Sequence, residues 1–191
     1  MMYIPRLKNI YNKKIVPLLK NKFKYKNNMQ VPKLIKIVIN IGAGKAINNK
    51  NLINNYFDNL ILITGQKPII RLSKKDIAGF KLRKGTAIGC MVTLRNNIMY
   101  EFLDRLISLA LPRSKDFNGI KENGFDGYGN YNLGIKEHII FPEISFDKVK
   151  IIHGLNISIV TNTNKDIIAK FLLLYLGLPF KINNIYGKRI N

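Results

Sequence analysis

Alternation of apolar and polar residues predicts β-strands in this chain. In the segment 34–41 isoleucines occupy positions 35, 37, 39 and 41, while Lys36, Val38 and Asn40 take the other side of the two-residue period. The segment 88–94 alternates in the same way, and its polar side carries Thr93 and continues to Arg95. Shorter apolar runs at 69–72, 131–141 and 155–161 bring the expected total to about five strands. We expect Lys36, Asn40, Thr93 and Arg95 on one exposed sheet face.

A spacing of three to four residues between apolar positions predicts helices in other parts of the chain. The expected helices span about 7–23, 49–64, 96–111 and 164–176. Pro17 should kink the first, and Asn49 and Gly65 should begin and end the second. Helices and strands do not alternate as βαβ units. The sequence therefore predicts an α+β fold: a single domain with a mostly antiparallel sheet and helices on one of its faces.

Two long stretches show no clear period. The segment 73–86 is rich in Lys and Arg, and the segment 113–130 contains four glycines. We interpret the first as a long basic loop and the second as a glycine-rich excursion, because long connections in small domains are often functional. The domain is expected to cover residues 1–181, followed by a basic tail at 182–191.

Charge narrows the choice of partners. The chain has 32 Lys and Arg against 11 Asp and Glu, a formal net charge of +21, and its first acidic residue is Asp58. Such an excess favours an anionic partner, and a block of one sign is typical of a surface that faces nucleic acid. The alternative is compositional drift. The chain contains 31 Ile, 25 Lys and 24 Asn, which AT-rich codons encode, so some lysines can reflect the genome of a reduced bacterium or an organelle.

The sequence contains no convincing motif for catalysis, for cofactor binding or for spanning a membrane. Gly42-Ala43-Gly44-Lys45 lacks the first glycine and the final Ser or Thr of a phosphate loop. Cys90 lies mid-strand among apolar residues, which favours a packed thiol over a nucleophile. The longest apolar run, 171–180, is too short to span a bilayer. We expect no enzyme, no cofactor, no metal site and no membrane partner.

The strongest indication of binding is a run of basic residues between positions 67 and 84. It contains a single acid, Asp76, and an aromatic residue, Phe80, beside Gly79. Lys and Arg contacts to phosphates supply salt-dependent affinity without sequence choice. A merely solvated basic hairpin loop is the other interpretation. The basic residues of this run are Lys67, Arg71, Lys74, Lys75, Lys81, Arg83 and Lys84.

A set of ordered motifs resembles one known family. The segments are MQVPK from Met29, NIGAG from Asn40, TGQKP from Thr64, AGFKLRKG from Ala78, VTLR from Val92, FDGYGNY from Phe125 and IIFPEI from Ile139. Together they resemble the bacterial-type ribosomal protein family that binds 5S ribosomal RNA, the fifth of the large-subunit series. The resemblance runs from about Tyr3 to Phe180.

The resemblance implies a structural ribosomal protein of the central protuberance. It implies that Asn40, Gln66 and Thr93 recognise 5S rRNA through hydrogen bonds, with Lys36 and Arg95 beside them. It also implies that the loop 73–86 contacts P-site transfer RNA through basic residues, and that 113–130 meets a small-subunit head protein at an intersubunit bridge. Large-subunit rRNA and neighbouring ribosomal proteins would be further partners. The implied loop residues are Lys74, Lys75, Lys81 and Arg83.

The composition and the motif wording also bear on the location of the protein and on one competing function. We expect a cytoplasmic ribosome of an AT-rich bacterium, with Bacteroidetes-type wording in SKKDIAGFKLR that suits a reduced endosymbiont; an organellar ribosome is the alternative. A general basic nucleic-acid-binding protein is the competing function. Polar Asn, Gln and Thr at defined sheet positions argue against it, because they suit specific hydrogen bonds.

Overall fold

The computed structural model describes residues 3–44, 50–115, 117–145, 149 and 151–181. A five-stranded sheet with the order β2-β3-β1-β5-β4 forms its centre, and every neighbouring pair is antiparallel. This confirms the expected α+β class with its antiparallel sheet. The strands are β1 (Leu34–Gly42), β2 (Ile69–Leu72), β3 (Ala87–Leu94), β4 (Tyr131–Ile135) and β5 (Leu155–Thr161). The expected tail at 182–191 lies outside the described residues.

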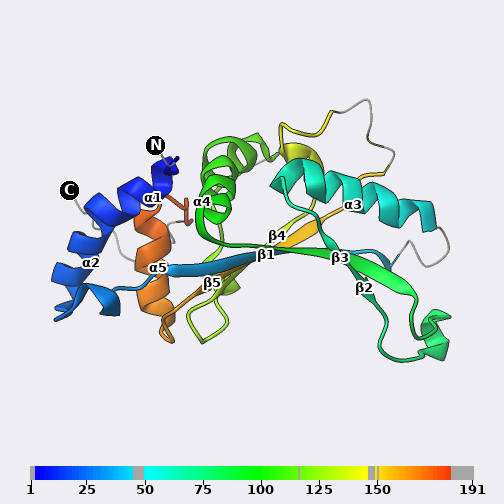
Figure 1. Cartoon of the computed structure of the whole chain (residues 1–191), viewed down its shortest axis with the longest axis horizontal. Helices are drawn as coiled ribbons and strands as arrows, with labels where there is room; N and C mark the ends of the chain where they lie inside the picture. The colour runs from blue at the N-terminus through cyan, green and yellow to red at the C-terminus, as the bar shows by residue number, and fades with distance from the viewer. Residues whose placement is uncertain (1–2, 45–49, 116, 146–148, 150, 182–191) are drawn as a thin grey trace.

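The helices lie over one face of the sheet and at one of its ends (Figure 1). Helices α3 and α4 run above the sheet, whereas α1, α2 and α5 gather at one end of the molecule and the β2–β3 hairpin extends from the other. The helices are α1 (Arg6–Ile10), α2 (Val16–Phe23), α3 (Lys50–Thr64), α4 (Asn96–Arg105) and α5 (Asp166–Tyr175). None of the described helices is long and apolar enough to cross a membrane.

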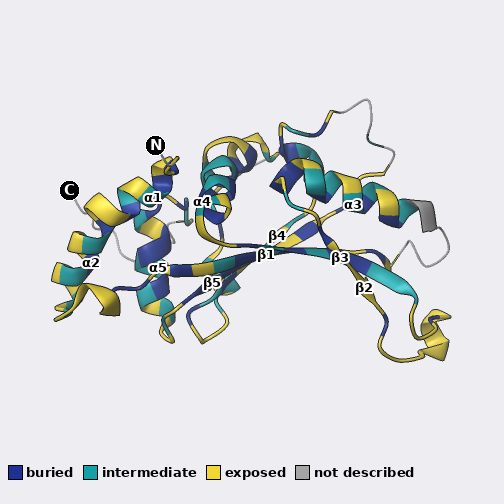
Figure 2. Cartoon of the chain, viewed as in Figure 1, coloured by how far each residue is buried: buried dark blue, intermediate teal, exposed yellow. Residues whose placement is uncertain are grey.

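The covered face of the sheet forms the core. Ile37, Ile39 and Ile41 of β1 are fully buried, as the alternation predicts, and neighbouring strands contribute residues such as Val92 and Ile157. Figure 2 shows the buried positions concentrated between the sheet and the helices. Removal of this apolar surface from water is the main force that holds helices and sheet together.

The first residues of β1 depart from the expected alternation. Ile35 is 40% exposed, whereas Leu34 is buried. The pairing of β1 with β5 shifts register between Leu34 and Lys36, which is a β-bulge. A bulge inserts one extra residue and reverses the side to which earlier residues point. The pattern of four isoleucines on one face was therefore wrong at Ile35.

The predicted helices exist, but two contain wider turns. A π-helical turn, Tyr11–Ile15, separates α1 from α2 directly before Pro17, which has no N–H for the normal helical bond. A second π turn, Leu106–Ala110, follows α4. The expected start of α3 at Asn49 falls outside the described residues.

The strand expected at 131–141 is too long. Strand β4 ends at Ile135, opposite Leu155, because β5 begins there and offers no earlier partner. The chain then makes a 3-10 turn at His138–Ile140. The backbone N–H of His138 donates to the carbonyl of His153 at 3.0 Å, so the turn is held to the segment that leads into β5.

The two histidines of the chain form a stacked pair at this turn. Their ring centroids lie 3.8 Å apart, His138 is fully buried and His153 is 9% exposed. Tyr56 of α3 packs against His153 with 4.4 Å between ring centroids. Burial lowers the pKa of His138, and burial together with the charge of His138 lowers the pKa of His153 to about 4. Both imidazoles are therefore neutral at neutral pH.

Candidate RNA interface on the open sheet face

The face of the sheet opposite the core carries polar residues among apolar ones such as Val38 and Met91. Antiparallel pairing places Asn40 of β1 beside Met91 of β3 on one side and beside Asn156 of β5 on the other. Thr93 of β3 lies opposite Val38 of β1, so it is a diagonal neighbour of Asn40. Asn40 and Thr93 are half-buried within this face. We call this side of the sheet the open face.

Gln66 joins Asn40 and Thr93 although it lies outside the strands. It follows Gly65, whose φ of +69° ends α3 with a left-handed residue. The Gln66 side-chain amide donates from Nε2 to the Thr93 carbonyl at 3.2 Å, next to the point where β2 begins its pairing with β3. This bond uses one amide hydrogen and leaves the Gln66 Oε1 as an acceptor. The structure thus brings Gln66 to Thr93 and Thr93 to Asn40.

Two cations expected on the same face lie at its edge. Lys36 precedes Val38 by two residues on β1 and is half-exposed. Arg95 follows the end of β3 in extended backbone, two residues after Thr93, and is exposed. Residues two apart on a strand point to one side, so this placement agrees with the expected polar face. Cations at the rim of a neutral polar surface suit phosphate contacts around specific hydrogen bonds.

The half of the open face that β5 and β4 form was not predicted from the sequence. Strands β5 and β4 continue it with Asn156, Ser158 and Asn132, and the Ser158 Oγ donates to Asn132 Oδ1 at 2.6 Å. Gly134 lies opposite Asn156. The alternation in 131–135 and 155–161 places these residues away from the core, so their positions were readable once each strand's buried side was known.

The basic loop 73–86 has its own backbone structure, contrary to the irregular loop expected. It prolongs the β2–β3 hairpin: Ser73 and Thr86 bond through their backbones at 2.8 Å, and Ile77 and Leu82 exchange two backbone bonds of 2.9 and 3.1 Å. The single acid, Asp76, accepts a hydrogen bond from the Lys84 backbone N–H at 2.7 Å. The segment shows no apolar period because almost all of its side chains are exposed on both sides of the hairpin.

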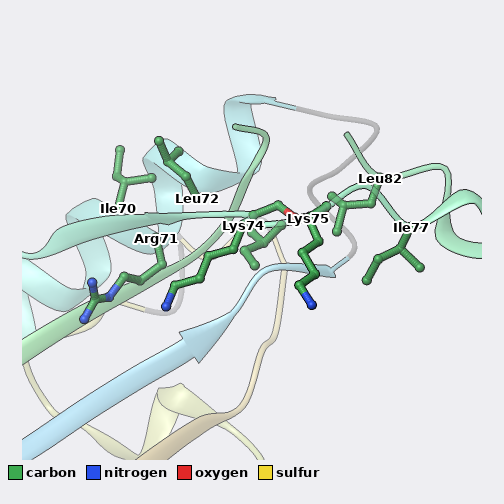
Figure 3. A pocket seen from close by; sticks show the side chains of 9 residues that line it. Ile70, Arg71, Leu72, Lys74, Lys75, Ile77 and Leu82 are labelled. Atoms are coloured by element: carbon green, nitrogen blue, oxygen red, sulfur yellow. Dashed lines mark hydrogen bonds between the residues drawn. The ribbon is translucent and has the colours of Figure 1, made fainter. Parts of the chain in front are cut away.

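The basic side chains of this hairpin are exposed. Lys74, Lys75, Lys81 and Arg83 extend into solvent, and none forms an ion pair within the described residues. Figure 3 shows Arg71, Lys74 and Lys75 beside a shallow groove whose apolar walls include Ile77 and Leu82. Phe80, at the far turn, is 73% exposed. The hairpin therefore presents cations and one aromatic ring at the end of the molecule from which it extends (Figure 1).

Residues 125–130 of the glycine-rich excursion form a turn held by two carboxylates. Asp166, at the start of α5, accepts backbone hydrogen bonds from Gly127 and Gly129 at 3.0 and 2.7 Å. Asp126 accepts from the Asn130 side chain at 2.8 Å and from backbone amides, and these bonds lower the pKa of Asp126. The tip exposes Tyr128, 73% accessible. The segment is thus a surface turn whose backbone is held by hydrogen bonds to Asp126 and Asp166.

The described residues contain no arrangement typical of catalysis or metal binding. No group of three His, Cys, Asp or Glu side chains comes together in this part of the chain. Cys90 is buried, and its burial raises the pKa of the thiol. The open face and the hairpin can hydrogen-bond and attract anions, but among the described residues no hydrogen bond there joins a hydroxyl or amine to a general base.

Known protein families match most of the chain, between residues 27 and 180. The family described as Ribosomal protein L5 matches residues 27–83, and the ribosomal L5P family C-terminus matches residues 87–180. The boundary between them falls in the β2–β3 hairpin, and strands from both parts pair in a single sheet.

Individual relatives are similar over their full length. The large ribosomal subunit protein uL5 of Christiangramia forsetii is 58% identical over 183 residues, which are 96% of this chain and 100% of the relative. Those of Geotalea daltonii and Desulforapulum autotrophicum are 57% and 59% identical, each across 92% of this chain and 98% of the relative. By these matches, and with the sheet and motifs in their order, the chain belongs to the ribosomal protein L5 family.

Proposed function

We propose that this protein is a structural constituent of the large ribosomal subunit that binds ribosomal RNA through the open face of its sheet. The relatives are named large ribosomal subunit proteins, and the L5 family is structural rather than enzymatic. The observation that carries the proposal is that Asn40 and Thr93 share one face of the sheet and that the Gln66 side chain is bonded to the Thr93 carbonyl. A net charge of +21 supplies the general attraction to RNA.

The RNA held by this face is 5S ribosomal RNA in our proposal. Asn40 and Thr93 form no hydrogen bond through their side chains to other described residues, so both offer donors and acceptors to a ligand. Gln66 is oriented by the Thr93 carbonyl, which leaves its Oε1 for the same ligand. Lys36 and Arg95 at the rim would contact phosphates. This arrangement supports binding to one RNA surface, and the family resemblance implies that this surface lies in the central protuberance.

The β2–β3 hairpin is proposed to contact P-site transfer RNA. The hairpin carries the cations Lys74, Lys75, Lys81 and Arg83 and extends from the end of the molecule opposite α2 (Figure 1). The backbone bonds between Ser73 and Thr86 give the hairpin a defined direction. A basic projection of this kind suits the sugar–phosphate backbone of an RNA outside the main interface.

The turn around Tyr128 is proposed to meet a protein of the small-subunit head at an intersubunit bridge. Its two carboxylates, Asp126 and Asp166, are engaged by backbone amides, so the tip presents mainly Tyr128 and backbone groups. Aromatic residues are enriched in protein interfaces. Tyr128 carries no charge at neutral pH, so a contact through charge is not part of the proposal here.

The site of action is a cytoplasmic ribosome. Relatives with 57–59% identity come from several bacteria, so identity alone does not single out one lineage. An AT-rich, reduced endosymbiont remains our proposal for the source, on the basis of the Ile, Lys and Asn content.

The experiment that tests this function measures the affinity of 5S rRNA for three single variants. Asn40→Ala, Gln66→Ala and Thr93→Ala should each cost roughly 1–3 kcal/mol of binding, because an RNA partner loses its hydrogen bond. Asn54→Ala is the matched control, since Asn54 is exposed on α3 and distant from the open face. If all three variants bind like the wild type in the same salt, the open face is not the 5S interface.

A further inference from the structure

The half of the open face formed by β4 and β5 has no role in the function described so far. Its outward residues are Asn132, Gly134, Asn156 and Ser158, which we call the neutral half-face. The segments Tyr131–Ile135 and Leu155–Thr161 contain no charged residue. The chain as a whole has a net charge of +21, but the neutral half-face carries polar residues without charge.

The residue types of the neutral half-face are unfavourable for a strand. Asn and Gly are depleted in strands because they pack poorly on a pleated surface, and Gly loses additional chain entropy. Compositional bias explains extra Asn in this chain, where AT-rich codons are favoured. It does not explain Gly134, because glycine codons begin with two guanines.

Gly134 is not required by the fold itself. Its φ lies outside the left-handed region, and a Cβ added there would contact only the Asn156 Oδ1, at an ordinary 3.6 Å. Gly89 on β3 differs, because a Cβ there would lie 2.7 Å from the Ile41 carbonyl oxygen. Gly134 thus leaves open space above the sheet that no neighbour in the chain needs. Glycine in a strand commonly marks a place where a ligand approaches closely.

Two cross-strand rows connect the neutral half-face with the proposed 5S interface. In one row Asn40 of β1 lies opposite Asn156, which lies opposite Gly134. In the other row Val38, the partner of Thr93, lies opposite Ser158, which lies opposite Asn132. One RNA that contacts Asn40 and Thr93 can continue across β5 and β4 without leaving the sheet.

Hydrogen bonding within the half-face fixes which groups remain for a ligand. Ser158 Oγ donates to Asn132 Oδ1 at 2.6 Å, which orients the Asn132 amide and leaves its NH₂ as a donor. Asn156 is exposed, and within the described residues its side chain forms no hydrogen bond. Amides both donate and accept, as a hydroxyl does, but they do not neutralise phosphate.

We propose that the neutral half-face binds ribose 2′-hydroxyl groups of the RNA that Asn40 and Thr93 hold, and so selects RNA over DNA. The inference rests on the proposed function, because it extends the same interface. The 2′-hydroxyl is a donor and an acceptor that DNA lacks. The open space above Gly134 can hold a ribose, and the uncharged amides of Asn132 and Asn156 can donate to and accept from its hydroxyl. Contacts to phosphate, in contrast, commonly use Lys and Arg.

The test compares affinities for 5S rRNA and for a DNA copy of the same sequence. The variants are Asn156→Ala, Ser158→Ala and Gly134→Val, with Asn54→Ala as the control on α3. We expect each half-face variant to bind 5S rRNA about three- to tenfold more weakly: Asn156→Ala and Ser158→Ala through the loss of one hydrogen bond, and Gly134→Val because its side chain fills the space left for the ribose. For Asn156→Ala and Ser158→Ala, affinity for the DNA copy should stay unchanged, so the ratio of RNA to DNA affinity falls.

Gly134→Val separates ligand loss from unfolding. Valine favours strands and the site has room for a Cβ, so this variant should unfold at the same or higher denaturant concentration than the wild type. Weaker RNA binding by a protein of equal stability then reports on the ligand alone.

The outcomes distinguish this inference from the function on which it rests. If the half-face variants bind 5S rRNA like the wild type while Asn40→Ala binds weakly, the half-face inference is wrong and the 5S interface stands. Equal losses for RNA and for the DNA copy would also overturn the 2′-hydroxyl assignment. If Asn40→Ala also binds 5S rRNA like the wild type, the proposed function itself fails.

Discussion

Acid should destabilise this protein through its buried histidine pair before the carboxylates contribute. The perturbation is His153→Phe, which keeps a ring against Tyr56 and His138 but removes one titrating group. In the wild type the pKa of His153 is lowered from 6.5 to about 4, first by burial and then by His138. An unfolded chain binds a proton at His153 across this interval, whereas the folded protein does not.

Proton linkage gives the direction and the size of the change in unfolding free energy with pH. The stability contributed by the neutral imidazole is fully present above pH 6.5 and is lost as the pH falls towards about 4. Each unit of pKa difference corresponds to about 1.4 kcal/mol. Between pH 6.5 and about pH 5 the free energy of unfolding should therefore fall by about 2 kcal/mol through His153 alone. Most carboxylates titrate below this interval.

Urea unfolding at several pH values measures this slope. Far-UV circular dichroism and tyrosine fluorescence can follow the transition, since the chain has no tryptophan. His153→Phe should lose about 2 kcal/mol less than the wild type over the same interval. Glu137→Gln, a change at an exposed neighbour, should keep the wild-type slope. Identical slopes for wild type and His153→Phe would refute the reasoning.

Two further predictions concern the hairpin and the thiol. Replacing Lys74, Lys75, Lys81 and Arg83 with Glu should leave 5S rRNA binding nearly intact near physiological salt, where long-range attraction is screened over roughly 8 Å, but should weaken P-site tRNA binding to ribosomes. A loss of 5S binding like that of Asn40→Ala, with tRNA affinity unchanged, would reverse the assignment. Cys90 should react slowly with a thiol reagent in the folded protein and quickly in urea, because burial raises its pKa; fast reaction in native buffer would show that the strand opens.

Two strands were predictable in both bounds, for different reasons. The segments 69–72 and 155–161 match β2 and β5. In β5 buried residues alternate with more exposed ones, whereas all four residues of β2 are exposed and Pro68 directly precedes them. The overextended strand at 131–141 shows the limit. Its sequence remains apolar, but β4 stops at Ile135 because β5 offers no further partner, and pairing length is a property of two strands.

The candidate site was predictable in part. Alternation placed Asn40 and Thr93 on one side of their strands, and the register of β1 and β3 confirms that they share a face. The bond from Gln66 to the Thr93 carbonyl joins residues that are 27 positions apart, and no local pattern encodes it. The continuation of the face onto Asn156 and Asn132 depends on the order of strands β1, β5 and β4, which sequence periodicity does not specify.

The proposed recognition of one RNA by the open face is tested most directly by a competition experiment with the wild-type protein. Labelled 5S rRNA, held by the protein near physiological salt, is displaced by unlabelled 5S rRNA, by an unrelated RNA of equal length or by duplex DNA. Charge alone attracts all three, because phosphate contacts carry no sequence information. Hydrogen bonds from Asn40, Gln66 and Thr93 predict that 5S rRNA competes at a far lower concentration than the other two. Equal competition by all three would contradict the account and would make the protein a general basic nucleic-acid-binding protein.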